Sequence, residues 1–429
     1  MDDDPRDVPR GRLGRLARLA SIGARAGANI LLNRDADAVA RKAAEALGTL
    51  RGVAAKVGQM AGYVDGMVPP EQRAAYEKWM KGLLAAAPKS SPAAIRAVIE
   101  EDLGASITEL YQEWDSSPIA SASIGQVHRA RLHDGREVAV KVQHPGVSRA
   151  VESDLQNAGL VERTVALVGG SKLESRRILE EVRQRFREEL DYTLEAARQR
   201  TFAEFFADDP GVAIPAVIDD RCGPRVLTTE LVGGLDFDAA CAAPEADRRA
   251  WAEALWRFVY RGTLIGGMFN ADPHPGNYFF QPGGRVMFLD FGCVQPVTPE
   301  RRQLGARAHW AASIGDERDF IAAGRAMLDL RGGGHEQRAL AYLRRAFEPQ
   351  FASPYRLTRE YSTALVEQFR SIAVTTLRER DDSFVSFPPG VFFLNRLQFG
   401  FYSVLARLDV AVDYAAIERA FLGPLFAGA

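Results

Sequence analysis

The stretch Asn270-Ala-Asp272-Pro-His-Pro-Gly-Asn277, followed by Asp290-Phe-Gly292, decides the fold of this chain. It sets an aspartate and an asparagine five residues apart and adds a second aspartate thirteen residues after Asn277. Phosphoryl transfer from a magnesium nucleotide needs such a set, because one carboxylate orients the attacking group while an amide oxygen and a second carboxylate hold the metal. The sequence therefore predicts Asp272 as the catalytic group, with Asn277 and Asp290 as Mg²⁺ ligands.

This spacing matches the D-x-x-x-x-N and D-F-G elements of protein kinases, although Asn270-Ala271 replaces the usual His-Arg. Asp-Phe-Gly alone is a common turn, so its context matters. Val286-Met-Phe-Leu289 is typical of a short buried strand that delivers Asp290, and Gly283-Gly284 supplies the preceding hairpin turn.

Two strands are expected upstream, over Ile124–Leu132 and Glu137–Val142, joined at Asp134-Gly135. Lys141 is the one ammonium in the apolar second strand, where burial is costly unless the charge is paired. One interpretation is a lysine that holds the α- and β-phosphates of a nucleotide and pairs with a helix glutamate. The alternative is a surface lysine on an edge strand.

A helix is predicted over Arg183–Phe206. Within it Glu188, Asp191 and Glu195 stand at i, i+3 and i+7, which places three carboxylates on one helix face. Such a face is tolerable when it is solvated, or when cations oppose it. Lys141 and Lys56 are the candidate cations.

Several motifs give the chain a resemblance to the UbiB/AarF family of atypical kinase-like ATPases, from about Leu13 to about Leu422. The motifs that carry the resemblance are Lys56-Val-Gly58-Gln59 for K-x-G-Q, Ala120-Ser-Ala-Ser-Ile-Gly-Gln-Val-His128 in place of a glycine-rich loop, Glu189-Leu-Asp191 for E-x-D, and Asn270 to Asn277. Chance is a poor explanation for four such motifs in this order.

The resemblance implies an α+β fold, a protein-kinase-like pair of lobes with an added N-terminal helical extension, that binds ATP or ADP with Mg²⁺. Lys141 and Glu195 would be the nucleotide lysine and its partner, beside Asp272, Asn277 and Asp290. The remaining nucleotide contacts would come from the alanine-rich loop and from a hinge strand, namely Ala120, Ser121, Ala122, Ser123, Glu230 and Val232. Lys56, Gln59, Glu189 and Asp191 would form a regulatory set, in which the extension docks near the active site.

The expected organisation is a helical extension over residues 1–104, a smaller mixed lobe over 105–234 and a helical lobe over 235–429. Ser91-Pro92 is typical of a helix N-cap and first helical residue. The chain has 429 residues, 47% of them hydrophobic, which suffices for a sizeable core. A net charge of −2 gives no indication of a nucleic-acid partner, and three widely spaced cysteines fit a reducing compartment.

Membrane contact is a separate question. The most apolar stretch, Trp251–Phe269, is broken by Glu253, Arg257 and Arg261, so we expect a buried core helix there. Arginines and apolar residues alternate over Arg10–Arg25, as in a helix on an anionic membrane surface or one packed on the protein body. With no signal peptide recognised, the expected location is cytoplasmic, or peripheral to the inner face of the membrane.

Three functions compete. Thr298-Pro-Glu300 arrives early where kinases have Ala-Pro-Glu, which leaves little room to dock a peptide and disfavours a protein kinase. A nucleotide-binding pseudokinase scaffold is disfavoured because Lys141, Asp272, Asn277 and Asp290 are all present. The family resemblance favours an atypical kinase or ATPase that supports isoprenoid-quinone (ubiquinone) or other lipid metabolism, with a lipid or quinone precursor as ligand.

Overall fold

The computed structural model describes residues 90–121, 124–149, 151–152, 184, 187–378 and 391–427. The chain forms two compact units. The sheet unit takes the described chain up to Tyr192 together with Asp220–Thr228, and the helical unit takes Thr193–Asp219 and the chain from Thr229 onward. The expected amphipathic segment Arg10–Arg25 lies outside the described residues.

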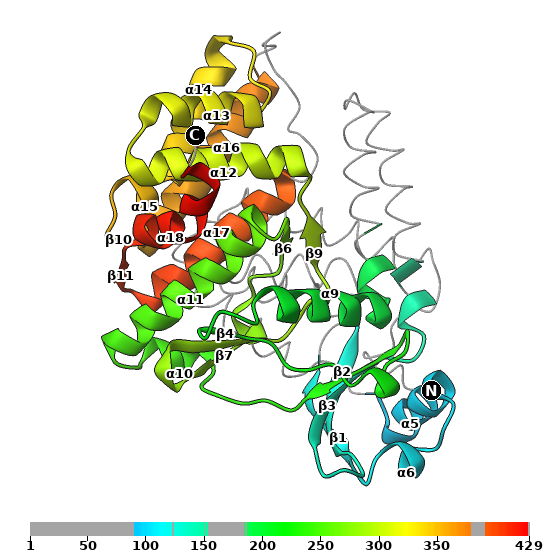
Figure 1. The fold of residues 1–429 in the computed structure, drawn as a ribbon. Coiled ribbons are helices and arrows are strands. Elements are labelled where there is room, and N and C mark those ends of the chain that lie inside the picture. The colour runs from blue at the N-terminus through cyan, green and yellow to red at the C-terminus, as the bar shows by residue number, and fades with distance from the viewer. Residues whose placement is uncertain are drawn as a thin grey trace, which may run out of the picture. The chain divides into compact units, whose positions relative to one another are not determined.

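The sheet unit is built on a four-stranded sheet in the order β1-β2-β3-β5 (Figure 1). Its elements are α5 (Pro92–Leu103), α6 (Ile107–Leu110), β1 (Glu113–Ser121), β2 (Gly125–Arg131), β3 (Glu137–Gln143) and β5 (Val226–Glu230), whose last two residues belong to the helical unit. Strands β1, β2 and β3 pair antiparallel. The two strands expected upstream are confirmed, and Gly135 takes a φ of 88° in the turn that joins them.

The start of α5 follows from its sequence. The side chain of Ser91 accepts a hydrogen bond from the amide of Ala94, and Pro92 occupies the first helical position, as predicted. Gly104 ends the helix in the left-handed conformation with a φ of 70°. Ile95, Val98 and Ile99 are buried, so this helix presents an apolar face to the core of the unit.

The helical unit combines long helices with short strands. Its elements, including η1, which spans both units, are α9 (Tyr192–Phe205), β4 (Val212–Ala213), η1 (Asp219–Arg221), α10 (Phe237–Cys241), α11 (Glu245–Leu264), β6 (Met268–Asn270), η2 (Pro275–Asn277), β7 (Tyr278–Gln281), η3 (Pro282–Gly284), β8 (Arg285–Phe288), β9 (Val294–Pro296), α12 (Pro299–Ile314), α13 (Glu317–Met327), α14 (Gly333–Ala346), α15 (Glu348–Phe351), β10 (Tyr355–Arg356), α16 (Arg359–Arg378), α17 (Val391–Leu408), β11 (Ala411–Val412) and α18 (Tyr414–Phe426). The short strands pair as β4-β8-β7, β6-β9 and β10-β11. The α+β class expected from the sequence is confirmed.

Helix α11 is the buried core helix predicted ahead of the catalytic loop. Trp251 and Trp256 are fully buried on it. Its arginines are accommodated by pairing, since Arg257 donates two hydrogen bonds, of 2.8 and 3.1 Å, to the carboxylate of Asp209. Bidentate pairing of this kind allows a guanidinium to lie at the edge of a core.

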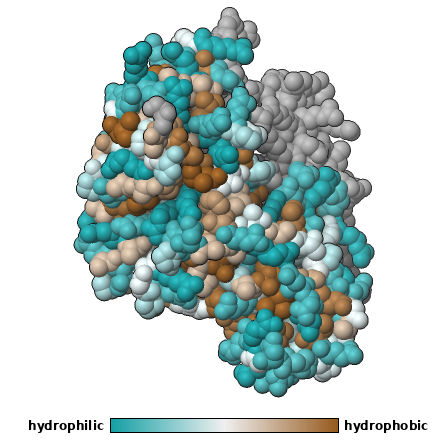
Figure 2. Space-filling model, viewed as in Figure 1, coloured by the Kyte–Doolittle hydropathy of each residue, from teal (hydrophilic) through white to brown (hydrophobic). Residues whose placement is uncertain are grey.

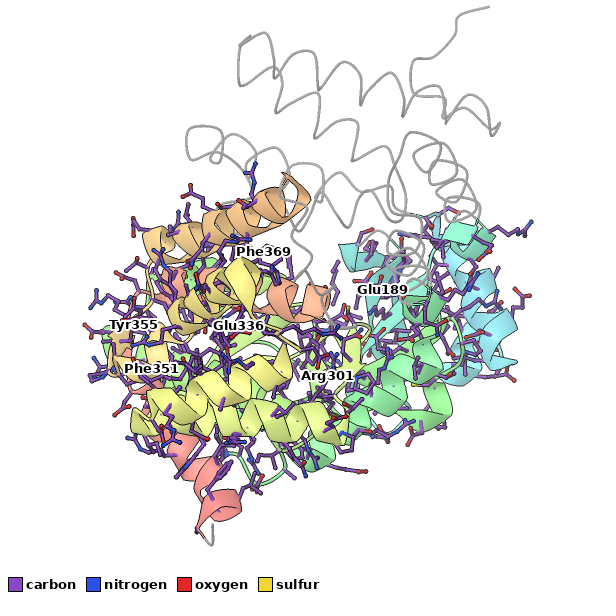
Figure 3. The ribbon with its side chains drawn as sticks, turned by 90° about the horizontal axis from the view of Figure 1, so that it is seen from above. Glu189, Arg301, Glu336, Phe351, Tyr355 and Phe369 are labelled. Atoms are coloured by element: carbon purple, nitrogen blue, oxygen red, sulfur yellow. The ribbon has the colours of Figure 1, made fainter. Side chains whose placement is uncertain are left out.

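One helix differs from its prediction. The helix expected over Arg183–Phe206 is interrupted at Leu190–Asp191, and α9 begins only at Tyr192, just after the Glu189 labelled in Figure 3. The amide of Tyr192 donates to the carbonyl of Pro224 (3.0 Å), and the carbonyl of Leu190 accepts from the side chain of Gln143 (2.7 Å). These partners replace the i→i−4 bonds of a helix, so Asp191 does not share a helix face with Glu195.

The surface is mixed. Figure 2 shows hydrophilic and hydrophobic residues interspersed over the viewed face. Large apolar residues exposed on the described chain are scattered over different elements, which is usual for proteins, and they are Ile119, Leu235, Ile314, Ile321 and Leu425. Among the described helices, none combines the length and apolar character that a bilayer crossing requires.

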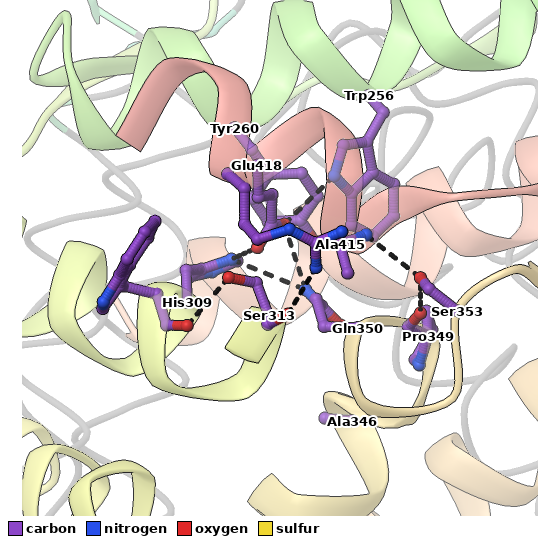
Figure 4. Close-up of polar contacts among 12 residues, drawn as sticks. Trp256, Tyr260, His309, Ser313, Ala346, Pro349, Gln350, Ser353, Ala415 and Glu418 are labelled. Carbon is purple, nitrogen blue, oxygen red and sulfur yellow. Dashed lines mark hydrogen bonds and ion pairs between the residues drawn. The ribbon is translucent and has the colours of Figure 1, made fainter. Parts of the chain in front are cut away.

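A buried carboxylate joins four helices of the helical unit (Figure 4). Glu418 of α18, fully buried, accepts hydrogen bonds from the indole of Trp256 in α11 (3.0 Å) and the amide of Gln350 in α15 (3.2 Å). The Nδ1 atom of His309 in α12 lies 3.0 Å from its second oxygen. The carboxylate therefore satisfies polar groups that the core would otherwise bury without partners.

We expect Glu418→Ala to lower the free energy of unfolding by about 3 kcal/mol, because it leaves buried donors without an acceptor. Chemical denaturation of the purified chain measures the change. The matched control is Glu245→Ala, which removes an exposed ion pair with Arg249 and should have little effect. Equal losses in the two variants would contradict a structural role for the buried carboxylate.

Candidate active site

The loop that follows β6 is organised by the side chain of Asn270. Its amide nitrogen donates a hydrogen bond to the backbone carbonyl of Asp290, and its oxygen accepts one from the amide of Asp272 (3.1 Å). One side chain therefore holds the backbones of both aspartates. In the sequence, Asn270 stands out only as part of the departure from His-Arg. An asparagine two residues before the aspartate is itself a signal, because such side chains bond the backbone two residues on.

Asn277 completes the loop. Its amide nitrogen donates to the carbonyl of Asp272 (3.2 Å), and its own carbonyl accepts from the amide of Leu289 (3.1 Å) at the end of β8. Strand β8 delivers Asp290 as predicted, after the two glycines of η3 with φ of 77° and 76°. The structure thus brings Asp272, Asn277 and Asp290 into one loop cluster.

The Asp-Phe-Gly segment is anchored from both sides. The Oδ1 atom of Asp290 accepts a hydrogen bond from the backbone amide of Gly292 (2.9 Å), which closes a tight turn. Phe291 is fully buried, with its ring centroid 5.2 Å from that of Phe202 in α9. Packing of the phenylalanine and the turn at the glycine together fix the direction in which the carboxylate points.

Helix α9 presents two polar side chains to this turn. Arg198 donates a hydrogen bond to the carbonyl of Gly292 (3.0 Å). A Cβ placed on Gly292 would lie 3.6 Å from a carboxylate oxygen of Glu195, which is 2% exposed. The helix therefore carries the predicted glutamate to the turn that holds Asp290. Arg198 was not anticipated from the sequence.

In the sheet unit, Lys141 lies in β3 between the buried residues Val140 and Val142, and its ammonium nitrogen lies 5.0 Å from the centre of the Tyr192 ring. Gln143 shares its strand face at i+2 and bonds the carbonyl of Leu190. The segment containing Glu189 and Asp191 is therefore tied to β3 within the same unit.

The strand register sorts the predicted loop residues by face. Ala120 pairs with Val127, which pairs with Lys141, so these three form one row across the sheet. Ser121 pairs with Gln126, on the opposite face, and its hydroxyl oxygen is buried without a hydrogen-bond partner among the described residues. Ala122 and Ser123 lie outside the described residues, as do Lys56 and Gln59.

The predicted hinge follows β5 in the helical unit. Glu230 is exposed and Val232 is half-buried. The amide of Glu230 donates to the carbonyl of Ala216 (2.8 Å), so its own carbonyl is the backbone group that an adenine would address at this residue.

The residues present suit a Mg²⁺ ion. Across the described ranges, no group of three or more His, Cys, Asp or Glu side chains is arranged to hold a metal. Mg²⁺ does not need one, because it is bound by one or two protein oxygens and takes its other ligands from phosphates and water. Asn277 and Asp290 supply oxygens of that type. Lys141 and Glu195 belong to different units, and their pairing stays a prediction.

Comparison with known proteins agrees with this geometry. The family model described as the ABC1 atypical kinase-like domain matches residues 82–323, more than half of the chain. The chain belongs to this family. The UbiB/AarF resemblance and the kinase-like α+β fold predicted from the sequence are confirmed.

Two animal proteins are similar in sequence to most of this chain. The chain is 32% identical over 332 residues to rat "Atypical kinase COQ8B, mitochondrial", an alignment that covers 72% of this chain and 62% of the rat protein. It is 30% identical over 357 residues to "Atypical kinase coq-8, mitochondrial" of Caenorhabditis elegans, covering 76% of this chain and 46% of the worm protein. The chain thus spans less than two thirds of the length of these relatives.

A solved structure is similar over nearly the whole chain. It is that of Rv3197 from Mycobacterium tuberculosis in complex with erythromycin, with a TM-score of 0.63 and 25% identity. The superposition covers 95% of this chain and 98% of the mycobacterial one.

Close packing at Gly125 gives a test of the packing around β3 in the sheet unit. A Cβ there would lie 2.5 Å from the carbonyl oxygen of Val142 and 2.7 Å from the hydroxyl of Tyr192. We expect Gly125→Ala to push β2 from β3 and to lower both the melting temperature and the affinity for a magnesium nucleotide, measured by thermal shift. Gly423→Ala, where no atom lies within 4 Å and the backbone is helical, is the control and should lower neither. A tolerated alanine at Gly125 would contradict the close packing.

Proposed function

We propose that this member of the ABC1 family binds ATP or ADP with Mg²⁺ and acts as an atypical kinase or ATPase that supports isoprenoid-quinone (ubiquinone) or other lipid metabolism. The observation that carries the proposal is the loop cluster held by Asn270, which brings together Asp272, Asn277 and Asp290, the kinds of group that such a reaction requires. The names of the COQ8-type relatives support the atypical kinase activity.

Each group has a defined task. Asp272 orients the acceptor hydroxyl or water, while Asn277 and Asp290 hold the metal on the phosphates. Bound Mg²⁺ neutralises charge that develops on the phosphoryl group. Lys141 holds the phosphates and pairs with Glu195, because a carboxylate 2% exposed needs a cation or hydrogen-bond donors to stay ionised.

The nucleotide is bounded by the alanine-rich loop and the hinge. Ala120 shares the sheet face of Lys141, so it lines the phosphate side together with Ser121, Ala122 and Ser123, whose backbone supplies the contacts. Glu230 and Val232 receive the adenine through their backbone. We place the extension over 1–104, the small lobe over 105–234 and the large lobe over 235–429.

The short segment after Asp290 argues against a general protein kinase. Only the six residues from Cys293 to Thr298, three of them in β9, separate Gly292 from the start of α12 at Pro299. A peptide substrate needs a longer platform than this. In our proposal Lys56 and Gln59 dock the extension on Glu189 and Asp191, which further shields the acceptor side and favours a small or lipid-like ligand.

A pseudokinase scaffold remains the alternative class. It would bind nucleotide with the same residues but would not turn it over. The organised loop favours turnover, because Asp272, which scaffold binding does not need, is held by both Asn270 and Asn277.

Removal of one metal ligand tests the site. We expect Asp290→Asn to abolish the Mg²⁺-dependent part of the thermal stabilisation by ATP or ADP while the chain remains folded, since an amide binds Mg²⁺ more weakly than a carboxylate. Asp316→Asn is the matched control, because asparagine also serves as an N-cap for α13. An unchanged Mg²⁺-dependent shift in Asp290→Asn would defeat the metal assignment.

Turnover and the extension are tested together. We expect nucleotide hydrolysis by the wild type to rise with anionic liposomes if Arg10–Arg25 contacts membranes, and Asp290→Asn to hydrolyse none.

Lys56→Ala should change nucleotide selectivity, autophosphorylation or phosphorylation of a generic protein, with Lys42→Ala as the control from the same extension. If all three properties stay as in the wild type, the restraint by Lys56 is wrong.

A further inference from the structure

A row of buried polar groups crosses the face of the sheet opposite Lys141. The amide of Ser90 donates to Oε1 of Gln126 (3.0 Å), and Nε2 of Gln126 lies 2.8 Å from Nε2 of His128. The Nδ1 atom of His128 lies 2.8 Å from the backbone carbonyl of Asp115. Gln126 is 1% exposed and His128 is fully buried, so water cannot substitute for any of these partners.

The chemistry of the two ends fixes the direction of every bond in the row. A backbone amide can only donate and a backbone carbonyl can only accept. His128 must therefore donate from Nδ1 to Asp115 and accept at Nε2 from the amide nitrogen of Gln126. Burial lowers the pKa of the His128 imidazole, which agrees with a neutral ring. Stacking on Trp114, with ring centroids 4.7 Å apart, holds the ring in place.

The row reaches the neck of the alanine-rich loop. Gln126 is the strand partner of Ser121, so the pair closes the loop at residues 122–125. The hydroxyl of Ser90 also bonds Nδ1 of His144 (2.8 Å), and the amide of His144 donates to the carbonyl of Ile124 (2.9 Å). Ser90 is thus linked twice to the C-terminal side of the loop, once through Gln126 and once through His144.

Ser90 is also where residues 1–89 join the described part of this unit. We propose that Gln126 is a positioning residue for nucleotide binding, whose amide locks the neck of the alanine-rich loop to Ser90 and thereby couples the loop to the N-terminal extension. This inference rests on the proposed nucleotide function. A role in core packing alone would be served by an apolar side chain, without the cost of burying an amide.

The coupling works because the amide cannot rotate without loss. If Gln126 turned over, its NH₂ group would face the donating amide of Ser90, and its oxygen would face the Nε2 lone pair of His128. Any shift of Ser90 therefore acts on the loop neck, and a nucleotide that fixes the loop acts on Ser90 by the same free energy.

The first test replaces the amide by an apolar side chain of similar length. In Gln126→Met, hydrogen exchange at the Ser90 amide should accelerate, and the affinity for Mg-ATP, measured by calorimetry on the full chain, should fall about tenfold for the loss of two buried hydrogen bonds. Gln112→Met, on an exposed side chain of the same unit, is the control and should change neither. Wild-type exchange at Ser90 together with wild-type affinity in Gln126→Met would overturn the proposal.

The second test keeps the shape of the Gln126 side chain and replaces its hydrogen-bond donor with an acceptor. In Gln126→Glu one carboxylate oxygen still accepts from Ser90, but the other meets the lone pair of His128. The imidazole of His128 should then bind a proton more readily, because the new carboxylate adds a second acidic group beside it, next to Asp115. The other histidine, His144, lies at the Ser90 end of the row. ¹⁵N NMR should show the His128 midpoint raised above that of the wild type, with nucleotide affinity of this variant stronger at pH 6 than at pH 8.

The two tests separate the inference from the function on which it rests. Wild-type chain that fails to bind Mg-ATP would overturn the proposed function, whereas hydrogen exchange at Ser90 would still report the link through Gln126. Wild-type binding with an unchanged His128 midpoint and a flat pH profile in Gln126→Glu would overturn the inference and leave the proposed function standing.

Discussion

The two-ended hydrogen bonding of Asn270 is the constraint on which the active loop depends. A carboxyamide has a donor and an acceptor a fixed distance apart, so it can set the spacing between two backbone segments. Here it joins the carbonyl of Asp290 to the amide of Asp272. One rigid group thereby sets the separation between the backbones of Asp272 and Asp290. The amide of Asn277 adds a further bond to the carbonyl of Asp272, so the same loop also holds the second metal ligand that we propose.

Strand β3 performs the corresponding task in the sheet unit, through both of its faces. On one face Lys141 and Gln143 project together, and Gln143 fixes the segment that carries Glu189 and Asp191. On the other face lie Gln126 and His128, opposite Val142 and Val140. A small movement of β3 would therefore reach both Lys141 and the link from Gln126 to Ser90, so in our proposal one strand serves nucleotide binding and its coupling to Ser90.

The features that the sequence predicts are those that depend on residues close together in the chain. The β2–β3 hairpin and the start of α5 depend on neighbouring residues, a glycine with positive φ and a serine before a proline, so the sequence predicts them. The break at Leu190 depends on Gln143 and Pro224, which lie far away in the sequence, and local periodicity cannot reveal it. The cluster of Asp272, Asn277 and Asp290 was predictable as a set from its spacing, and the bond from Asp272 to Asn270 had a local signal. The bonds from Asn270 to Asp290 and from Arg198 to Gly292 are long-range, and no local pattern indicates them.

Buried polar groups have different functions in the two units because their chemistry differs. Glu418 accepts from several sides and has no inherent direction, so it joins four helices and stabilises whatever arrangement brings donors to it. Gln126 presents a donor on one side and an acceptor on the other, so it stabilises a single arrangement and penalises its reverse. A carboxylate suits the interior of a scaffold that need only stay folded. An amide suits the neck of a loop that takes one position, and under the proposed nucleotide function this difference accounts for the neutral group beside the alanine-rich loop.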